Sequence, residues 1–216
     1  MDPSTSEQLA RWKRGAFSYS SMALAPWRSP IARALHRNRS DAHARFFQLA
    51  TVMPDGRPAN RTVVFRGFFP NTDTLEVVTD ARSEKVAQID RQPWGEVCWY
   101  FTKTREQFRI AGRLKFVSAD ATDADLQRER QERWYDLSDS ARLQFIWPQP
   151  KASRDSDRNA FFVKAPAANT KPASTFNLLL VEPVAVDWLE LRGDPQNRTL
   201  FLQTDDGKWS VRSVNP

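Results

Sequence analysis

The chain has 216 residues, 40% of them hydrophobic and 12% aromatic, a composition that excludes an intrinsically disordered protein and predicts a folded domain with a sizeable core. A single cysteine, Cys98, excludes an internal disulfide framework and is typical of a reducing compartment. The formal net charge is +6, but 32 basic residues are interleaved with 26 acidic ones, so the charge pattern favours a solvated surface over a nucleic-acid-binding patch.

The chain begins with a polar, loosely patterned segment over residues 1–25, which we interpret as a flexible extension before a single domain over 26–216. No run approaches the ~20 consecutive apolar residues of a membrane helix. The N-terminus also lacks the apolar core of a signal peptide. These features predict a soluble cytoplasmic protein without membrane contact.

The first predicted element is a helix. Ser29 is a candidate N-cap and Pro30 suits the first helical position, so a helix should run toward Arg45 with Ile31 and Ala34 facing inward. The chain's two histidines also fall in this segment. No cluster of acidic residues or cysteine joins them, so no metal site is predicted.

Strand patterns separated by turn signals make up most of the remaining chain. The clearest is residues 106–117, where apolar and polar residues alternate and Gly112 predicts a bulge or a close backbone approach. Ser83 is a candidate N-cap for a short helix, and residues 121–145 have a helical pattern with Leu126, Trp134, Leu137 and Leu143 facing inward. The predicted strands are 46–52, 57–66, 75–79, 96–101, 106–117, 176–181 and 184–191, followed by a hairpin over 200–211. This pattern predicts an α+β protein built on an antiparallel β-barrel or sandwich.

The strand over residues 57–66 is the most informative for function. Arg61 and Arg66 are five positions apart, so an extended strand would direct them to opposite faces. Val63 and Val64 between them have the composition of a buried strand. Such a strand suits a planar molecule that carries a phosphate, and we take it as the beginning of a flavin phosphate site.

Further donors for a phosphate dianion follow within 25 residues: Thr79, Arg82, Ser83 and Lys85. They fall at a strand end, in a turn or at a helix N-terminus, where backbone N–H groups also favour an anion. Each has a structural alternative. Arg61 is equally compatible with a surface charge, Ser83 with a helix cap, and Lys85 with an exposed helix position; their succession favours the phosphate site.

Common catalytic signatures are missing from the chain. It has no Gly-x-Ser-x-Gly, no glycine-rich dinucleotide fingerprint and no P-loop. No side-chain acid, base or nucleophile is singled out by the sequence, so no catalytic residue is predicted. If the protein is an enzyme, a cofactor carries the chemistry.

The motifs together resemble the pyridoxamine 5′-phosphate oxidase family, in which the corresponding strings include Arg-x-Val-Leu-Leu-Lys, Tyr-Thr-x-x-x-Ser-x-Lys and Arg-Gln-Val-x-x-x-Gly. The resemblance covers about residues 30–216. It rests on Gly56-Arg-Pro-x-x-Arg61-x-Val-Val-Phe-Arg66, Thr79-Asp-x-Arg-Ser-x-Lys85, Arg105-Glu-Gln-Phe-Arg-Ile-x-Gly112, the pair Trp188 and Arg198, and the terminal Trp209-x4-Val-x-Pro216.

The resemblance implies a mostly antiparallel split β-barrel with flanking helices, a homodimer, and FMN at the subunit interface. Arg61, Ser83 and Lys85 would hold the flavin phosphate with help from Arg82. The further FMN contacts that it implies are Val63, Val64, Thr79, Gln107, Gln149, Trp188 and Arg198.

Departures from the family pattern concern the substrate. Arg66 replaces a substrate-facing lysine, and Asp194-Pro195-Gln196 stands where the family has Arg-x-His. The family's helical phosphate pocket is not recognisable, although Arg142 supplies a charge in that region. We therefore expect an FMN-dependent oxidoreductase of a divergent branch acting on a small molecule. The alternatives are a genuine pyridoxamine/pyridoxine 5′-phosphate oxidase, a non-catalytic flavin- or haem-binding module, and a basic nucleic-acid binder.

Overall fold

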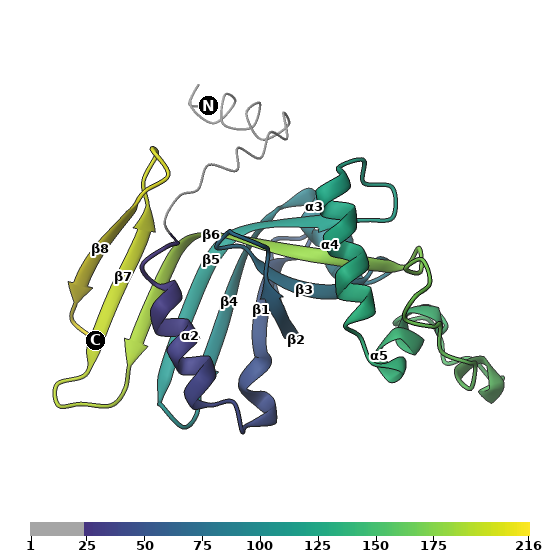
Figure 1. The fold of residues 1–216 in the computed structure, drawn as a ribbon, viewed down its shortest axis with the longest axis horizontal. Coiled ribbons are helices and arrows are strands. Elements are labelled where there is room, and N and C mark those ends of the chain that lie inside the picture. The colour runs from purple at the N-terminus through teal and green to yellow at the C-terminus, as the bar shows by residue number, and fades with distance from the viewer. Residues whose placement is uncertain (1–23) are drawn as a thin grey trace.

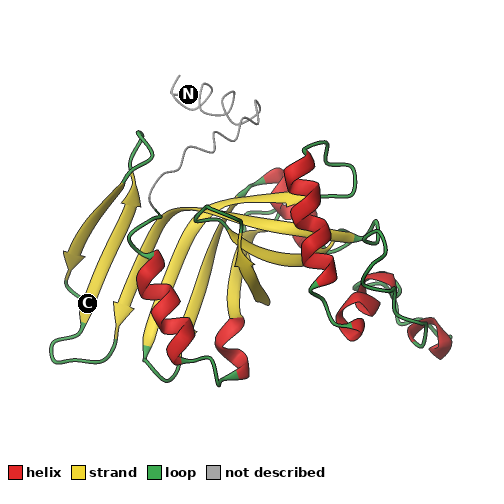
Figure 2. Ribbon diagram, in the orientation of Figure 1, coloured by secondary structure: helices red, strands yellow, loops and turns green. Residues whose placement is uncertain are grey.

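The computed structural model describes residues 24–216, in which eight antiparallel strands form one sheet (Figure 1; Figure 2). They are β1 (Phe46–Val52), β2 (Pro58–Phe68), β3 (Leu75–Asp80), β4 (Trp94–Phe101), β5 (Glu106–Val117), β6 (Phe176–Glu190), β7 (Asn197–Gln203) and β8 (Trp209–Val214). The order is β3-β2-β1-β4-β5-β6-β7-β8, and pairing of β3 with β6 closes β1 to β6 into a barrel. β7 and β8 extend the sheet beyond it. The predicted fold class, α+β with a mostly antiparallel barrel, is confirmed.

Helices flank the barrel, and the described residues contain α2 (Arg28–Arg37), α3 (Glu84–Arg91), α4 (Ala124–Tyr135) and α5 (Asp139–Leu143). Three short 3-10 helices accompany them: η1 (Ala42–Arg45), η2 (Gln144–Ile146) and η3 (Arg158–Phe161). No helix in residues 24–216 combines the length and apolar character needed to cross a bilayer. The extension predicted over residues 1–25 lies, except for its last two residues, outside the described chain.

The first helix is shorter than predicted. α2 ends at Arg37 instead of continuing toward Arg45, and Ser29 lies inside the helix rather than at its N-cap. The buried Asn38 accounts for the end. Its Nδ2 donates to a carbonyl oxygen of the last helical turn (2.8 Å), and its Oδ1 accepts the backbone N–H of Lys103 (2.9 Å). Because these bonds fix Asn38 between the helix end and the β4–β5 turn, the chain leaves the helix there.

The segment predicted as one helix over 121–145 forms α4 and α5 with a break between them. Ser138 begins the second helix, since its hydroxyl oxygen accepts a backbone N–H of the first turn of α5 (3.3 Å). Leu126, Trp134 and Leu137 are buried as predicted, whereas Leu143 is only partly buried. A polar side chain that caps a new helix thus divides an otherwise continuous helical pattern.

β6 is one strand, although the sequence predicts two strands broken before Val184. Gly112 pairs with Pro183 and the preceding residue of β5 pairs with Ala185, so Val184 is the extra residue of a bulge. Pro183 is tolerated because it stands at this irregularity. A Cβ on Gly112 would lie 2.3 Å from the carbonyl oxygen of Glu182, so the predicted close backbone approach at Gly112 is confirmed.

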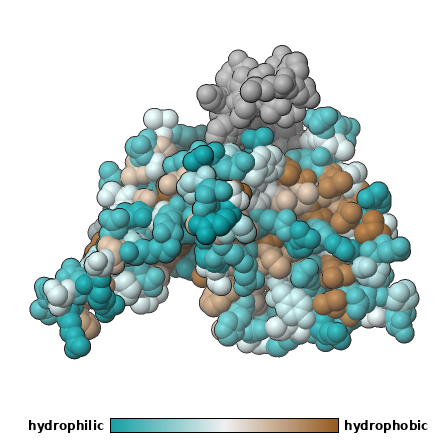
Figure 3. All heavy atoms as spheres, turned by 180° about the vertical axis from the view of Figure 1, so that it is seen from behind, coloured by the Kyte–Doolittle hydropathy of each residue, from teal (hydrophilic) through white to brown (hydrophobic). Residues whose placement is uncertain are grey.

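Within residues 24–216, one face of the extended sheet is covered by a helix and the other is not. On the covered side, Trp99, Phe108 and Trp188 follow one another across β4, β5 and β6, and α2 packs over them with Ile31 and Ala34 in the same core. The opposite side, seen from behind in Figure 3, is called the uncovered face below. It carries Tyr100, Gln107, Arg109, Leu189, Arg198 and Leu202.

Candidate functional site

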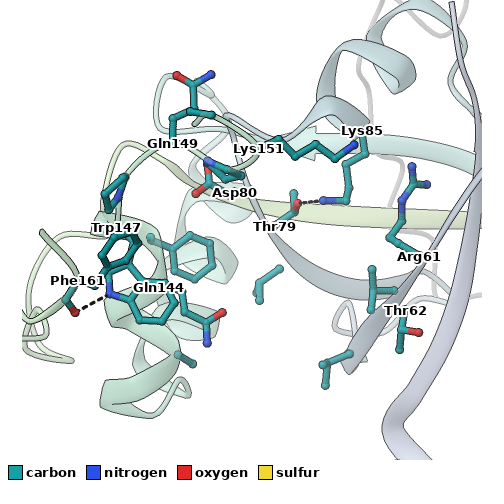
Figure 4. A pocket seen from close by; sticks show the side chains of 18 of the residues that line it. Arg61, Thr62, Thr79, Asp80, Lys85, Gln144, Trp147, Gln149, Lys151 and Phe161 are labelled. Atoms are coloured by element: carbon teal, nitrogen blue, oxygen red, sulfur yellow. Dashed lines mark hydrogen bonds between the residues drawn. The ribbon is translucent and has the colours of Figure 1, made fainter. Parts of the chain in front are cut away.

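A cavity of about 630 Å³ opens between the barrel and the segment that follows α5 (Figure 4). β2 and β3 provide one wall, and α5, η2 and the loop over 147–155 provide the other. This volume falls in the range of roughly 300–1,000 Å³ that is usual for small-molecule sites. Among the lining residues are Arg61, Val63, Val64, Thr79, Lys85 and Gln149, all of which the sequence analysis assigned to the flavin.

One end of the cavity is cationic. Lys85, in the first turn of α3, donates from Nζ to the hydroxyl oxygens of Thr79 (2.9 Å) and Ser83 (2.7 Å). Burial lowers the pKa of Lys85, and the nearby charge of Arg61 lowers it further, against an opposing effect of Asp80. Within residues 24–216, neither Lys85 nor Arg61 forms an ion pair with a carboxylate. Two neighbouring cations without a paired carboxylate favour binding of an anion.

The guanidinium of Arg61 is oriented by uncharged acceptors. Nη1 donates to Thr51 Oγ1 (2.6 Å) and to the carbonyl oxygens of Leu49 (3.1 Å) and Ala59 (3.3 Å). Nη2 donates to Gln88 Oε1 (2.9 Å). Burial lowers the pKa of this arginine, opposed by the charge of Glu84 in α3. The side chain is therefore held in place while its positive charge is not neutralised by a bonded carboxylate.

Arg66 lines the same cavity as Arg61, although an uninterrupted strand would direct the two side chains to opposite faces. Phe65 pairs with Val77 and Gly67 with Glu76, which makes Arg66 the extra residue of a β-bulge and interrupts the alternation of sides. Its Nε is buried without a hydrogen-bond partner in the described part of the chain.

The remaining end of the cavity is aromatic. Trp147 and Phe161 pack edge to face with ring centroids 6.1 Å apart, and Trp147 Nε1 donates to the carbonyl oxygen of Phe161 (3.1 Å). Phe145 and Gln144 line the same region. This end offers planar apolar contact and the amide of Gln144, with the Arg154 guanidinium 4.5 Å from the centroid of the Phe161 ring, while Arg61 and Lys85 lie together at the other end (Figure 4).

Arg82 does not line the cavity, in contrast to the phosphate-assisting role given to it. Its Nε and Nη2 donate to the carboxylate of Asp80 (2.9 and 2.6 Å), and Nη1 donates to the carbonyl oxygen of Trp147 (2.8 Å). Arg82 thereby fastens the loop that begins at Trp147 to the β3–α3 turn. Gln149 belongs to this loop, and its side chain lies at the outer rim, directed away from Lys85 (Figure 4).

Comparison with known proteins identifies the family of this chain. A family model described as the FMN-binding domain of pyridoxamine 5′-phosphate oxidase matches residues 24–118. The "Pyridoxine/pyridoxamine 5′-phosphate oxidase 2" of Arabidopsis thaliana is 37% identical over 198 residues, which cover 89% of this chain and 98% of that protein. The chain belongs to the pyridoxamine 5′-phosphate oxidase family. The resemblance found in the motifs is therefore confirmed.

Solved structures of this family and fold agree with the assignment. A pyridoxamine 5′-phosphate oxidase-related, FMN-binding protein from Nostoc punctiforme is 55% identical, with a TM-score of 0.87 over 90% of this chain and all of that one. PhzG from Burkholderia lata, solved with tetrahydrophenazine-1-carboxylic acid, has a TM-score of 0.71 over 92% of this chain and 95% of its own. At 18% identity, PhzG shows the shared fold alone.

Besides Arg82 and Ser83 of the β3–α3 turn, which do not line the cavity, three residues of the extended sheet that the family resemblance assigned to FMN lie outside it. Gln107 and Arg198 are on the uncovered face, where Arg198 donates from Nε and Nη2 to the carboxylate of Asp187 (2.9 and 2.6 Å). Trp188 lies on the covered face, stacked on Phe108 with ring centroids 5.8 Å apart. The structure of one chain thus brings together the residues of β2, β3 and α3, and leaves these three apart from them.

Arg142 is likewise separate from the cavity lining. It is buried, and its guanidinium donates to the carbonyl oxygens of Leu137 and Pro166 and to the carboxylate of Asp139. These contacts fix α5 and account for the arginine structurally. The predicted substrate contact of Arg142 has no support from its position outside the lining.

Sequence reasoning missed the residues that orient Arg61. Thr51 and Gln88 are buried polar side chains in elements that the sequence did predict, a strand and a short helix. The available signal was Gln88 itself, a polar residue beside the inward-facing Ile89. The aromatic end was also missed, because it depends on folding of the proline-rich loop that follows η2 back onto β3.

Proposed function

We propose that this protein is an FMN-dependent oxidoreductase whose flavin phosphate is held by Arg61, Lys85, Thr79 and Ser83. The observation that carries the proposal is the pair of cations, Arg61 and Lys85, which share one end of the cavity without a paired carboxylate. Membership of the pyridoxamine 5′-phosphate oxidase family supports FMN as the ligand whose phosphate would bind these cations. The FMN-binding domain would comprise residues 26–216.

The flavin ring would lie along β2. Val63 and Val64 line the cavity next to the cationic end and offer an apolar surface, and Thr79 offers polar groups from β3. When bound, FMN would supply the capacity to accept a hydride from a small-molecule substrate. The protein's own contribution would be to bind the phosphate, orient the ring and exclude water with the loop that begins at Trp147.

We also propose a homodimer formed through the uncovered face. Tyr100 and Leu202 are 42% and 47% exposed on this face, an apolar character that favours a partner. A second copy would bring Gln107 and Arg198 toward the flavin, which accounts for their absence from the cavity of a single chain. Trp188 would act only by supporting this sheet from its covered side.

A cytoplasmic location remains part of the proposal, on the basis of the single Cys98.

Genuine pyridoxine/pyridoxamine 5′-phosphate oxidase activity is a second candidate. The 37% identity to the Arabidopsis protein of that name, over nearly its whole length, favours it. Arg66 would contact the substrate, since its buried Nε has no partner within residues 24–216 and the residue lines the cavity. Conversion of pyridoxamine 5′-phosphate to pyridoxal 5′-phosphate by the flavin-loaded protein would establish this candidate. Absence of turnover beside bound FMN would exclude it.

The cofactor test is direct. Purified protein should contain non-covalent flavin that is released by heat and identified chromatographically as FMN, at about one per chain. Colourless protein whose melting temperature does not rise with added FMN would contradict the proposal. A screen of electron donors on the loaded protein separates an enzyme from a binding module, because in a module no organic donor would reduce the bound flavin with repeated turnover.

A further inference from the structure

We infer that Thr51 and Gln88 are positioning residues that aim Arg61 into the cavity and, being uncharged, leave its positive charge for an anionic ligand. The inference rests on the proposed phosphate site and extends it to residues behind the cavity wall. Neither Thr51 nor Gln88 lines the cavity. Their effect on the ligand would therefore pass entirely through Arg61.

The three side chains form a closed hydrogen-bonded triangle. Arg61 Nη1 donates to Thr51 Oγ1 (2.6 Å), Arg61 Nη2 donates to Gln88 Oε1 (2.9 Å), and Thr51 Oγ1 donates to Gln88 Oε1 (2.7 Å). Thr51 thus uses its hydroxyl both as acceptor and as donor. Two donors converge on Gln88 Oε1, which fixes the amide with its oxygen toward the guanidinium.

The triangle is buried. Thr51 is 2% exposed and Gln88 is 5% exposed, so water does not readily replace either partner. A buried polar side chain that lacks a hydrogen-bond partner destabilises the folded state. Breaking the bonds to Arg61 would leave Thr51 and Gln88 with fewer partners in a buried place. The hydrogen bonds therefore restrict the guanidinium of Arg61 to one orientation.

Helix α3 couples the two cations. It carries Lys85 and Gln88 three positions apart, so that the two side chains project from adjacent parts of its surface. Lys85 faces the cavity, while Gln88 holds Arg61 from behind. The like charges of Lys85 and Arg61 repel each other, and the triangle is what keeps Arg61 near Lys85 when no anion is present.

Because Gln88 is uncharged, it positions the Arg61 guanidinium without neutralising its charge, and a charged substitution at this position separates the two effects. A glutamate there would accept the same two hydrogen bonds, and would hold the guanidinium more tightly because the bonds would be charge-assisted. It would also offset the charge of Arg61 at close range. Gln88→Glu therefore preserves the geometry and removes the electrostatic attraction for a phosphate, whereas Gln88→Met removes the acceptor and keeps the volume.

The test measures dissociation constants of flavin-free protein for FMN and for riboflavin, which lacks the phosphate. Wild type should prefer FMN. Gln88→Glu should reduce this preference by about tenfold or more, and Gln88→Met and Thr51→Val by about threefold or more, because charge-assisted bonds are lost or offset. Riboflavin affinity should be unchanged in all three, and Thr51→Ser, which keeps the hydroxyl, should retain the wild-type preference.

Gln92→Glu is the matched control, because it adds the same charge at the exposed end of α3 outside the triangle. It should leave the preference unchanged. Equal losses for FMN and riboflavin, or an unchanged preference in Gln88→Glu and Gln88→Met, would overturn the inference. If the Gln88 variants do not fold, Thr51→Val and Thr51→Ser test the inference by the same ratio of riboflavin to FMN dissociation constants. A reduced ratio in Thr51→Val alone supports the inference, and equal ratios overturn it. A wild type that does not prefer FMN would instead refute the proposed phosphate site.

Discussion

At the scale of single residues, the two arginines of β2 show how one cavity divides its tasks. Arg61 has four uncharged acceptors, and Arg66 has a buried Nε without one. Arg61, whose guanidinium is already oriented, suits a cofactor that stays bound. Arg66, whose Nε has no acceptor within residues 24–216, suits a substrate that binds and dissociates in each catalytic cycle.

Replacement of these arginines should therefore have different effects. Arg61→Ala should weaken FMN binding by about tenfold to a hundredfold, the loss expected for a charge-assisted hydrogen bond. Arg66→Ala should retain the flavin and lose turnover. Flavin absorbance per chain after gel filtration measures the first effect, and steady-state kinetics measures the second. Arg128→Ala, at an exposed position of α4, is the control. An Arg66→Ala protein without flavin would show that this division of tasks is wrong.

Glu76 is a buried acid outside the cavity whose ionisation bears on stability. Burial raises its pKa to about 8 from an ordinary value of 4.5, Arg133 opposes this increase, and the charge of Glu129 adds to it. Arg133 Nε lies 2.9 Å from Glu76 Oε2, but neither Glu76 oxygen accepts a well-directed hydrogen bond within residues 24–216. The folded protein therefore holds the proton more tightly than the unfolded chain does.

The sign of the resulting pH dependence follows from linkage. Because unfolding releases the proton of Glu76 between about pH 4.5 and about pH 8, the free energy of unfolding should fall as pH rises through that window. Glu76→Gln should remove most of this fall, because glutamine does not titrate and binds no proton in either state. Urea denaturation at the two ends of the window measures it, with the exposed Glu132→Gln as control. Identical slopes for Glu76→Gln and wild type would contradict the assignment.

At the scale of elements, the loop that begins at Trp147 determines the shape of the cavity. Arg82 connects its first residue to Asp80, and Lys151 pairs with Glu84 at the start of α3. The loop thus depends on the β3–α3 turn, the same turn that supplies Ser83 and Lys85. Closure over the cavity and formation of the cationic end are parts of one local structure.

Arg82→Ala should release this loop. Lys151 and Arg154 are exposed in it, and Arg158 is exposed in the following η3, so limited trypsin digestion should cut the variant there several times faster than wild type, since local opening exposes the backbone. Arg128→Ala again provides the control, because it removes an arginine elsewhere. The cleavage sites are identified by mass spectrometry. Equal digestion rates would mean that Arg82 does not hold the loop.

The elements also show what the sequence could predict. The bounds of β1 and β5 were predicted to the residue, because alternating side chains between turn signals describe a strand completely. The sequence does not predict where α2 ends or where α4 and α5 divide, because each boundary depends on one side chain: Asn38 in the first case and Ser138 in the second. The motif around Arg61 predicts a phosphate contact, and Arg61 does line the cavity. Its partner Gln88 comes from a different element, and local patterns do not report such contacts.

At the scale of the whole molecule, the barrel has two dissimilar sides. α2 packs over one side of the sheet, whereas the uncovered face combines apolar side chains with Gln107 and Arg198. The cavity and these two residues belong to one proposed site only if a second chain is present. Flavin binding and dimerisation should therefore depend on each other.

Charges placed on the uncovered face should separate the two chains. The double variant Tyr100→Asp/Leu202→Asp should be a monomer with FMN affinity reduced by about tenfold or more, because unpaired charges are costly to bury in an interface. Light scattering after gel filtration measures the mass, and flavin titration measures the affinity. Phe162→Asp is the control, since Phe162 is 81% exposed in the loop outside the uncovered face. A variant that stays dimeric, or a monomer that binds FMN normally, would contradict the linked site.

Arg61 and Lys85 are the proposed phosphate site for FMN. The site is tested by the dissociation constants of the flavin-free wild-type protein for FMN and riboflavin, compared with those of Lys85→Met. Wild type should bind FMN at least about tenfold more tightly than riboflavin, and Lys85→Met should lose most of this difference while its riboflavin affinity is unchanged. Equal affinities for the two flavins in the wild-type protein would contradict it.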